Sequence, residues 1–155
     1  MNKKHIIYVL SGLLIGLLLL VVYFGIQFKT PIMNIQKLNN AIEIVKRDLG
    51  ESLLATDIYT SGDGTSIAGH NSNPKACALF NELTTNLVKS LDSSGFPGLN
   101  EYYMLHLKDG HLVIVVYLIE YQWGFLVDSD KVKLGLLLNI VIPNAREAFI
   151  EALES

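Results

Sequence analysis

The sequence has little cysteine and no cluster of positive charge. The first absence argues against disulfide-bonded and cysteine-based metal proteins, and the second against nucleic-acid-binding proteins. Cys77 is the single cysteine in 155 residues, so we expect no internal disulfide and no cysteine-based metal site. From residue 34 onward, nine Lys or Arg stand against fifteen Asp or Glu, a formal charge of −6. A domain of that charge without a basic patch does not attract phosphate backbones, so we expect no nucleic-acid partner.

Side chains grouped for catalysis or metal binding are also lacking. His70, His106 and His111 lie near predicted turns, but no Asp, Glu or Cys is placed to complete a set of three or four metal ligands. There is no Ser-His-Asp grouping and no close carboxylate pair. Asp128 and Asp130 follow a predicted strand and are expected to cap the next helix. The sequence therefore predicts a protein that is not an enzyme and holds no cofactor or metal.

Formal charge is absent from Ile6 to Phe28, a run of 23 mostly apolar residues. A helix of that length, at about 1.5 Å per residue, spans the hydrocarbon layer of a bilayer, which is about 30 Å thick. The run is longer than the apolar part of a signal peptide, and it ends in aromatic residues rather than at a cleavage site. It predicts an uncleaved transmembrane helix that contacts the lipid bilayer.

The lysines that flank this run predict its orientation. Lys3 and Lys4, with the terminal amine, precede it, and Lys29 and Lys37 follow it. Positive residues prefer the cytoplasmic side of a membrane, so the small excess before the run favours a cytoplasmic N-terminus and an exported domain. We expect a single-pass protein of a bacterial or archaeal inner or cytoplasmic membrane.

Within the predicted span, Gly12 and Gly16 form a G-x-x-x-G pair, which allows two membrane helices to approach closely. An ordinary lipid-facing helix is the alternative interpretation of this pair.

The chain as a whole divides into four parts. They are a basic tail (1–5), a transmembrane helix (6–28), a linker (29–33) and one domain (34–155).

Hydrophobic periodicity predicts the helices of the domain. Apolar residues recur every three or four positions over 35–49 and again over 74–91, where an Asn-Pro pair marks the helix start. The apolar run over 132–142 fits a helix or a strand, and Pro143 after it is expected to kink or restart a helix. A last helical stripe covers 145–153.

Apolar and aromatic runs bounded by turns predict five strands. The first run is followed by a glycine-rich turn over 60–65, which is not expected to bind phosphate because a strand rather than a helix comes after it. The last three strands are expected to form an antiparallel meander. The predicted strand segments are 53–59, one that begins at 67–68, 102–107, 112–119 and 123–127.

This order of elements resembles the roadblock/LC7 family over residues 34–155. Two local patterns carry the resemblance: Asp63-Gly64-x-x-Ile67-Ala68 in the first hairpin, and Val127-Asp128 through Leu134-Gly135-Leu136 between the last strand and the last helix. The resemblance implies an α+β, profilin-like fold, in which a five-stranded antiparallel sheet carries two helices on one face and one on the other. It favours a helix over 132–142, although Pro143 departs from the continuous last helix of the family.

The family resemblance also implies how the protein associates. Members usually dimerise through the middle helix and the edge strand before the meander, which correspond to 74–91 and 102–107 here. Packing within the monomer is an equally weighted alternative for Tyr102, Tyr103 and Met104. The candidate interface residues are Phe80, Leu83, Leu87, Tyr102, Met104, Leu105 and His106.

Three functions follow from these features. The leading hypothesis is a non-enzymatic, membrane-anchored scaffold that forms a homodimer or joins a larger membrane complex. Family members also regulate small Ras-like GTPases, so a membrane-tethered GTPase regulator is the alternative if the domain is cytoplasmic. The third is an extracytoplasmic sensor that binds a small ligand on its sheet, for which the sequence names no polar pocket.

Overall fold

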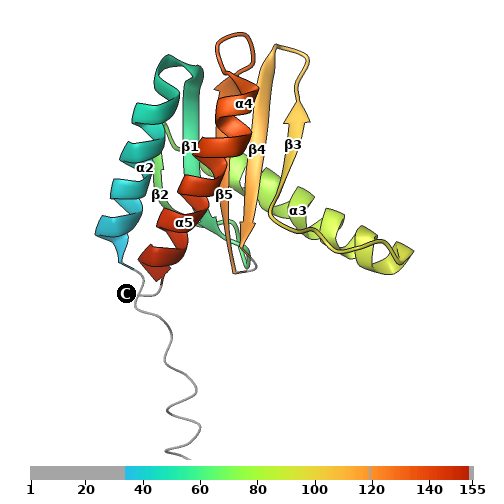
Figure 1. The fold of residues 1–155 in the computed structure, drawn as a ribbon. Coiled ribbons are helices and arrows are strands. Elements are labelled where there is room, and N and C mark those ends of the chain that lie inside the picture. The colour runs from blue at the N-terminus through green and yellow to red at the C-terminus, as the bar shows by residue number, and fades with distance from the viewer. Residues whose placement is uncertain (1–33, 119, 154–155) are drawn as a thin grey trace, which may run out of the picture. The chain divides into compact units, whose positions relative to one another are not determined.

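The computed structural model describes residues 34–118 and 120–153, which form one sheet with helices on both of its faces (Figure 1). The elements are α2 (Ile35–Leu49), the 3₁₀ turn η1 (Gly50–Ser52), β1 (Leu53–Thr60), β2 (Ser66–His70), α3 (Pro74–Ser94), β3 (Tyr102–His106), β4 (His111–Leu118), β5 (Tyr121–Asp128), α4 (Leu134–Leu136), the π-helix η2 (Leu137–Val141) and α5 (Ile142–Leu153).

The five strands pair in the order β2-β1-β5-β4-β3, and every pairing is antiparallel. This confirms the predicted five-stranded antiparallel sheet and the meander of β3, β4 and β5. Strand β4, the apolar run of the sequence analysis, lies between two neighbours and is buried over most of its length. Strands β2 and β3 form the two edges of the sheet.

Helices α2 and α5 cover one face of the sheet and enclose most of the core (Figure 1). The indole of Trp123 stacks on Phe125 with ring centroids 5.0 Å apart, and its centroid lies 6.0 Å from that of Phe149 on α5. The indole N–H donates to Thr56 Oγ1 at 2.7 Å, so the buried polar atom is paired. The α2 prediction is confirmed, and Gly50 ends this helix with a φ of 53°.

Helix α3 covers the opposite face, as predicted, and its ends are formed by the expected residues (Figure 1). The side chain of Asn73 accepts hydrogen bonds from the first turn, and Pro74 occupies the first helical position. Gly95 ends the helix in the left-handed conformation, with a φ of 71°. Only Cys77 and Thr84 are buried among its 21 residues.

The C-terminal segment is helical from Leu134 to Leu153, with a π-helical turn immediately before α5. Pro143 lies in the first turn of α5, directly after this wide turn. Because proline has no N–H and its ring clashes with the preceding turn of an α-helix, the change of helix type accommodates it. The helical assignment of 132–142 is thus confirmed for residues 134–142.

The expectation that Asp128 and Asp130 cap this helix was wrong. The backbone N–H of Asp130 donates to Asp128 Oδ1 at 3.0 Å, so the carboxylate closes a turn at the end of β5. The helix begins only at Leu134, and Lys133 precedes it without a side-chain cap. The turn places both carboxylates too early in the chain to reach the helix start.

The predicted transmembrane helix, Ile6 to Phe28, and its Gly12–Gly16 pair lie outside the described residues. Among residues 34–118 and 120–153, no helix combines the length and the hydropathy of a membrane span.

Candidate functional site

The β3 edge of the sheet is open within the described part of the chain. Strand β3 pairs with β4 along one side, from Tyr102 opposite Val116 to His106 opposite Leu112. Met104 and Leu105 are both exposed, and they point to opposite sides of the strand. An apolar edge strand with free N–H and C=O groups is a surface to which another strand can pair.

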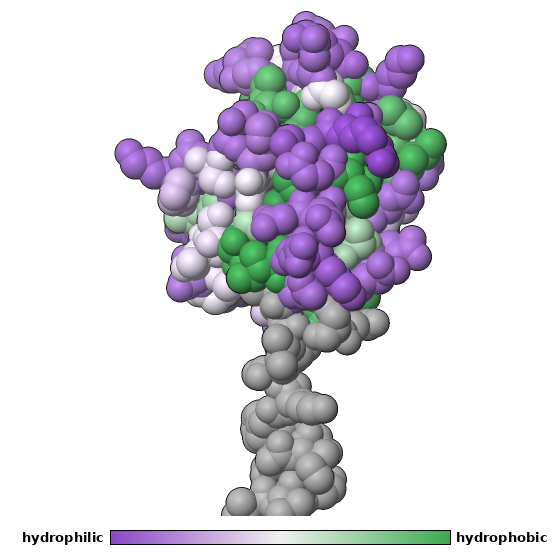
Figure 2. All heavy atoms as spheres, turned by 90° about the vertical axis from the view of Figure 1, so that its left-hand side faces the viewer, coloured by the Kyte–Doolittle hydropathy of each residue, from purple (hydrophilic) through white to green (hydrophobic). Residues whose placement is uncertain are grey.

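The β2 edge and the adjoining helix α2 differ from this. Strand β2 presents small or polar residues such as Ser66, Gly69 and His70. Figure 2, which looks at the left-hand side of Figure 1, shows a mostly hydrophilic surface there with separate hydrophobic areas. The exposed hydrophobic residues of α2 are Ile35 and Ile44. The β3 side of the molecule is therefore the stronger candidate for a protein interface.

Helix α3 has an apolar flank beside the sheet, which we call the α3 flank. It consists of residues three or four positions apart and contains no charged residue; they are Ala76, Leu79, Phe80, Leu83, Leu87 and Leu91. Leu79 is 52% exposed and Leu83 40% exposed, and the other four are half-buried. The other flank of the helix is polar, and Asn81 there accepts a hydrogen bond from Gln122 Nε2 at 2.6 Å.

Helix α3 crosses β3 near the middle of the helix and continues beyond the edge of the sheet (Figure 1). The crossing point is defined by Thr84 and Tyr103, whose hydroxyl groups lie 2.9 Å apart. Burial raises the pKa of the Tyr103 phenol, while its hydrogen bond to Thr84 acts in the opposite direction. The second half of α3, residues 85–94, has no strand of its own sheet beneath it.

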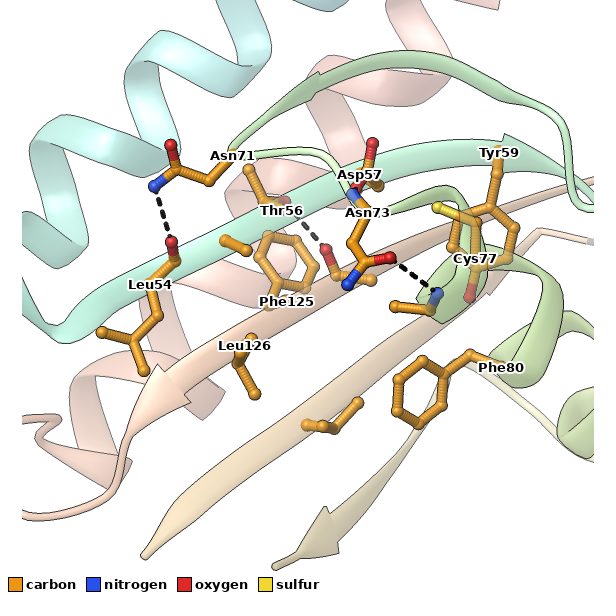
Figure 3. Close-up of a pocket in the computed structure, with 14 residues that line it drawn as sticks. Leu54, Thr56, Asp57, Tyr59, Asn71, Asn73, Cys77, Phe80, Phe125 and Leu126 are labelled. Atoms are coloured by element: carbon orange, nitrogen blue, oxygen red, sulfur yellow. Dashed lines mark hydrogen bonds between the residues drawn. The ribbon is translucent and has the colours of Figure 1, made fainter. Parts of the chain in front are cut away.

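A cavity of about 300 Å³ lies between the first half of α3 and the sheet (Figure 3). Its walls are mostly apolar, and they come from α3, from the three central strands and from the segment before α3. The residues around it are Leu54, Ala55, Thr56, Asp57, Tyr59, Asn71, Asn73, Ala76, Cys77, Phe80, Val113, Gly124, Phe125 and Leu126.

Asp57 anchors the start of α3 at one side of this cavity. Its Oδ1 accepts from Ser66 Oγ at 2.8 Å and from Ser72 Oγ at 2.6 Å, and its Oδ2 accepts from the Asn73 N–H at 3.1 Å. A Cβ on Gly69 would lie 2.3 Å from Asp57 Oδ1, so only glycine fits there. The carboxylate thus ties β1, β2 and the first residue before α3 together.

Two ionisable groups of the cavity, Cys77 and Tyr59, are held in their neutral forms. Burial, with Asp57 adding to it, raises the pKa of the Cys77 thiol to about 12. The Cys77 side chain is 2% exposed. Burial also raises the pKa of Tyr59, whose ring lies over Gly124 and whose hydroxyl has no hydrogen-bond partner in the structure. The Cys77 thiol, which stays protonated, is therefore a poor nucleophile.

The candidate interface residues fall in two places. On α3, Leu83 is exposed, whereas Phe80 and Leu87 are half-buried. On β3, Met104, Leu105 and His106 are exposed, but Tyr102 packs against the core beneath α5, as in the alternative interpretation. Within residues 34–118 and 120–153, no three His, Cys, Asp or Glu side chains gather in a way that would hold a metal ion.

Sequence reasoning missed the cavity and Phe96. The cavity is formed by strands that are distant in sequence, so no local pattern predicts it. Phe96 follows the end of α3 in a short loop, and at 67% it is the most exposed large hydrophobic residue of the described chain. Its signal was available, since a phenylalanine between the helix-ending Gly95 and Pro97 has no helical or strand stripe to join.

Comparison with known proteins gives a match at the level of structure alone. No family model matches the sequence, and no curated protein matches it. Among solved structures, the gliding protein MglB from Thermus thermophilus has a TM-score of 0.63 and 12% identity over 77% of this chain and 90% of that one.

Two further structures agree with this match. An MglB with tetrameric arrangement has a TM-score of 0.61 and 13% identity over 76% of this chain and 90% of its own. A roadblock/LC7 domain from Streptomyces avermitilis has a TM-score of 0.52 and 14% identity over 72% of this chain and 97% of its own. At these identities the similarity shows the fold, and the described domain has the roadblock/LC7 fold.

Proposed function

We propose that this protein is a non-enzymatic scaffold that associates with a second copy of itself through α3 and β3 and so forms an assembly point for a larger complex. The observation that carries the proposal is the position, side by side, of two apolar surfaces that no other part of residues 34–118 and 120–153 covers. The open edge of β3 adjoins the α3 flank, and the second half of α3 extends past that edge.

The geometry supports a two-fold pair. When two β3 strands pair antiparallel, their sheets join into one, and both α3 helices lie on the same face of the joined sheet. Burying Leu79, Leu83 and Leu105 in such a contact removes exposed apolar side chains from water, which is the main favourable contribution to association. The fold it shares with an MglB of tetrameric arrangement is consistent with self-association.

A single charge introduced into the apolar contact tests the proposed interface. Leu83→Asp and Leu105→Asp each place a carboxylate in the proposed interface, where it would be buried without a partner. We expect the full chain, purified in detergent, to change from dimer to monomer in sedimentation or light scattering. Leu134→Asp on α4, another exposed leucine, is the matched control and should leave the mass unchanged.

The charged variants must remain folded for this test to count. The far-UV circular dichroism of each variant should therefore match that of the unmodified chain, and each variant should unfold in urea at the midpoint that the unmodified chain shows at low protein concentration. Folded Leu83→Asp and Leu105→Asp proteins that keep a dimeric mass would contradict the α3–β3 interface.

We further propose that residues 6–28 anchor the domain on the outer side of the membrane, as the hydropathy and flanking lysines of the sequence suggest. The test replaces Cys77 and introduces Ser61→Cys at a half-buried position directly before the exposed Gly62 and Asp63 of the β1–β2 turn. A membrane-impermeant thiol reagent should label this cysteine in intact cells. Labelling only after permeabilisation would place the domain in the cytoplasm, and a nucleotide-dependent pull-down would then test the alternative of a GTPase regulator.

A further inference from the structure

The second half of α3 has a definite reach in the proposed dimer. From Thr84, which crosses β3, to Ser94, the last residue of α3, there are ten residue steps, or about 15 Å along the helix, and Phe96 follows directly after the Gly95 cap. Neighbouring strands lie about 4.8 Å apart, so a helix that runs across the strands covers about three strand spacings beyond β3 with this length. Counted across a β3–β3 seam, the end of α3 reaches β5 of the other copy, and Phe96 lies just beyond it.

The cavity occupies that same region of the sheet. Gly124 and Leu126 of β5 and Ala55 and Asp57 of β1 line it, with Val113 of β4 on the nearer side. It opens beside the α3 flank, because Ala76 and Phe80 belong both to the flank and to the cavity wall. A partner helix laid against the flank would therefore lie over the cavity.

The spacing of leucines on α3 is compatible with the same register. In an antiparallel pair of α3 helices centred on Thr85, Leu79 lies opposite Leu91 of the other copy, and Leu83 lies opposite Leu87. This register places Phe96 opposite Pro74, the first residue of α3. Asn73 and Ala76, on either side of Pro74, both line the cavity.

We propose that Phe96 of each copy inserts into the cavity between α3 and the sheet of the other copy, so that two aromatic anchors lock the dimer. The inference rests on the proposed self-association and identifies the residue that fills the pocket. It explains why a 67% exposed phenylalanine follows the helix and why an apolar cavity of about 300 Å³ lies at the expected distance. A buried aromatic side chain in a fitted pocket is the usual form of a binding hot spot.

The first experiment measures the dimer dissociation constant of the full chain in detergent by analytical ultracentrifugation. Phe96→Ala should weaken the dimer about tenfold to a hundredfold, as expected for an aromatic anchor. Phe96→Leu should recover part of the affinity, since it restores apolar volume. Leu134→Ala, which removes another exposed apolar side chain far from the cavity, is the matched control and should have no effect.

A second readout reports on the cavity itself. Cys77 is the only cysteine and lines the cavity, so its rate of modification by a small uncharged thiol reagent measures access to that space. At protein concentrations where both proteins are dimeric, Phe96→Ala should make Cys77 react faster. Ala55→Leu, which fills the cavity from its floor, should weaken the wild-type dimer and partly restore the Phe96→Ala dimer.

The outcomes separate this inference from the function on which it rests. A chain that is monomeric at every concentration overturns both. A dimer whose dissociation constant and Cys77 reactivity are unchanged by Phe96→Ala overturns only the insertion of Phe96. Release of a small apolar molecule from the purified dimer on denaturation, with Phe96→Ala without effect, would show that a ligand rather than the partner fills the cavity.

Discussion

The two faces of the sheet differ in how completely they are covered. On the α2 and α5 face, large side chains such as Trp123, Phe125 and Phe149 are fully buried and in mutual contact. On the α3 face, a 21-residue helix buries two side chains and stands over a cavity. One face is closely packed, whereas the other leaves apolar side chains of α3 exposed.

This difference indicates a division of roles. Apolar area buried on the α2 and α5 face stabilises the monomer, whereas apolar area left on the α3 face is available for association. Substitutions on the first face should therefore change the free energy of unfolding. Substitutions on the second should change mainly the dimer dissociation constant.

The largest expected effect comes from Phe149→Ala on the closed face. The ring contacts Tyr121 and Trp123, with centroid distances of 5.9 and 6.0 Å, and it has no exposed surface. Loss of an aromatic ring from such a core costs about 3–5 kcal/mol in the free energy of unfolding. Urea denaturation followed by Trp123 fluorescence measures this. A loss below about 1 kcal/mol would contradict a tightly packed closed face.

A smaller loss is expected from Asp57→Ala, which acts at the start of α3. The substitution leaves the Asn73 N–H and the hydroxyls of Ser66 and Ser72 without their acceptor. We expect about 1–3 kcal/mol of destabilisation in urea. Ser72→Ala removes only one of these donors and leaves the carboxylate its other two, so its effect should be clearly smaller. Equal losses in the two variants would show that the carboxylate does not act as a common anchor.

The open face should tolerate truncation almost without loss of monomer stability. Leu79→Ala removes a side chain that is 52% exposed, so the unfolding free energy of the monomer should change by less than about 0.5 kcal/mol. The dimer dissociation constant should nevertheless rise. Urea curves at low and high protein concentration separate the two quantities. A destabilised monomer would mean that the α3 flank is part of the core.

The smallest change concerns the chemistry of Cys77 rather than stability. Since burial and Asp57 raise its pKa to about 12, the thiolate is the minor form at pH 8 to 10. Alkylation of the folded protein should therefore rise about tenfold per pH unit across this range without a plateau. In urea the same thiol should level off near pH 9. An early plateau in the folded protein would show a more open cavity.

Much of the fold was predictable because its signals are local. The Asn73–Pro74 start and the Gly95 end of α3 depend on caps within one turn, and the apolar run of β4 is contiguous in sequence. The predicted strand boundaries also hold to within a few residues, as in β5, which extends from Tyr121 to Asp128. The π-helical turn before Pro143 was the exception, because such a turn depends on how the helix packs and not on a local sequence signal.

The candidate site was only partly predictable. The leucines of α3 stand out as a stripe, yet periodicity does not say whether a stripe faces its own sheet or solvent. Tyr102 and Met104 illustrate this, since they are two residues apart on one strand and one packs on the core while the other is exposed. Tyr102 lies next to Glu101, which borders the same hollow as Ile142 and Arg146 of α5.

By itself, the sequence determined the order of helices and strands, the absence of a basic patch and the apolar run at 6–28, because each depends on residues close together in the chain. Only the tertiary structure decided that α3 lies across the sheet and extends past β3, leaving a cavity behind its first half and Phe96 beyond its end. The reason is physical: coverage of a sheet depends on the angle and length of a helix relative to strands that are distant in sequence.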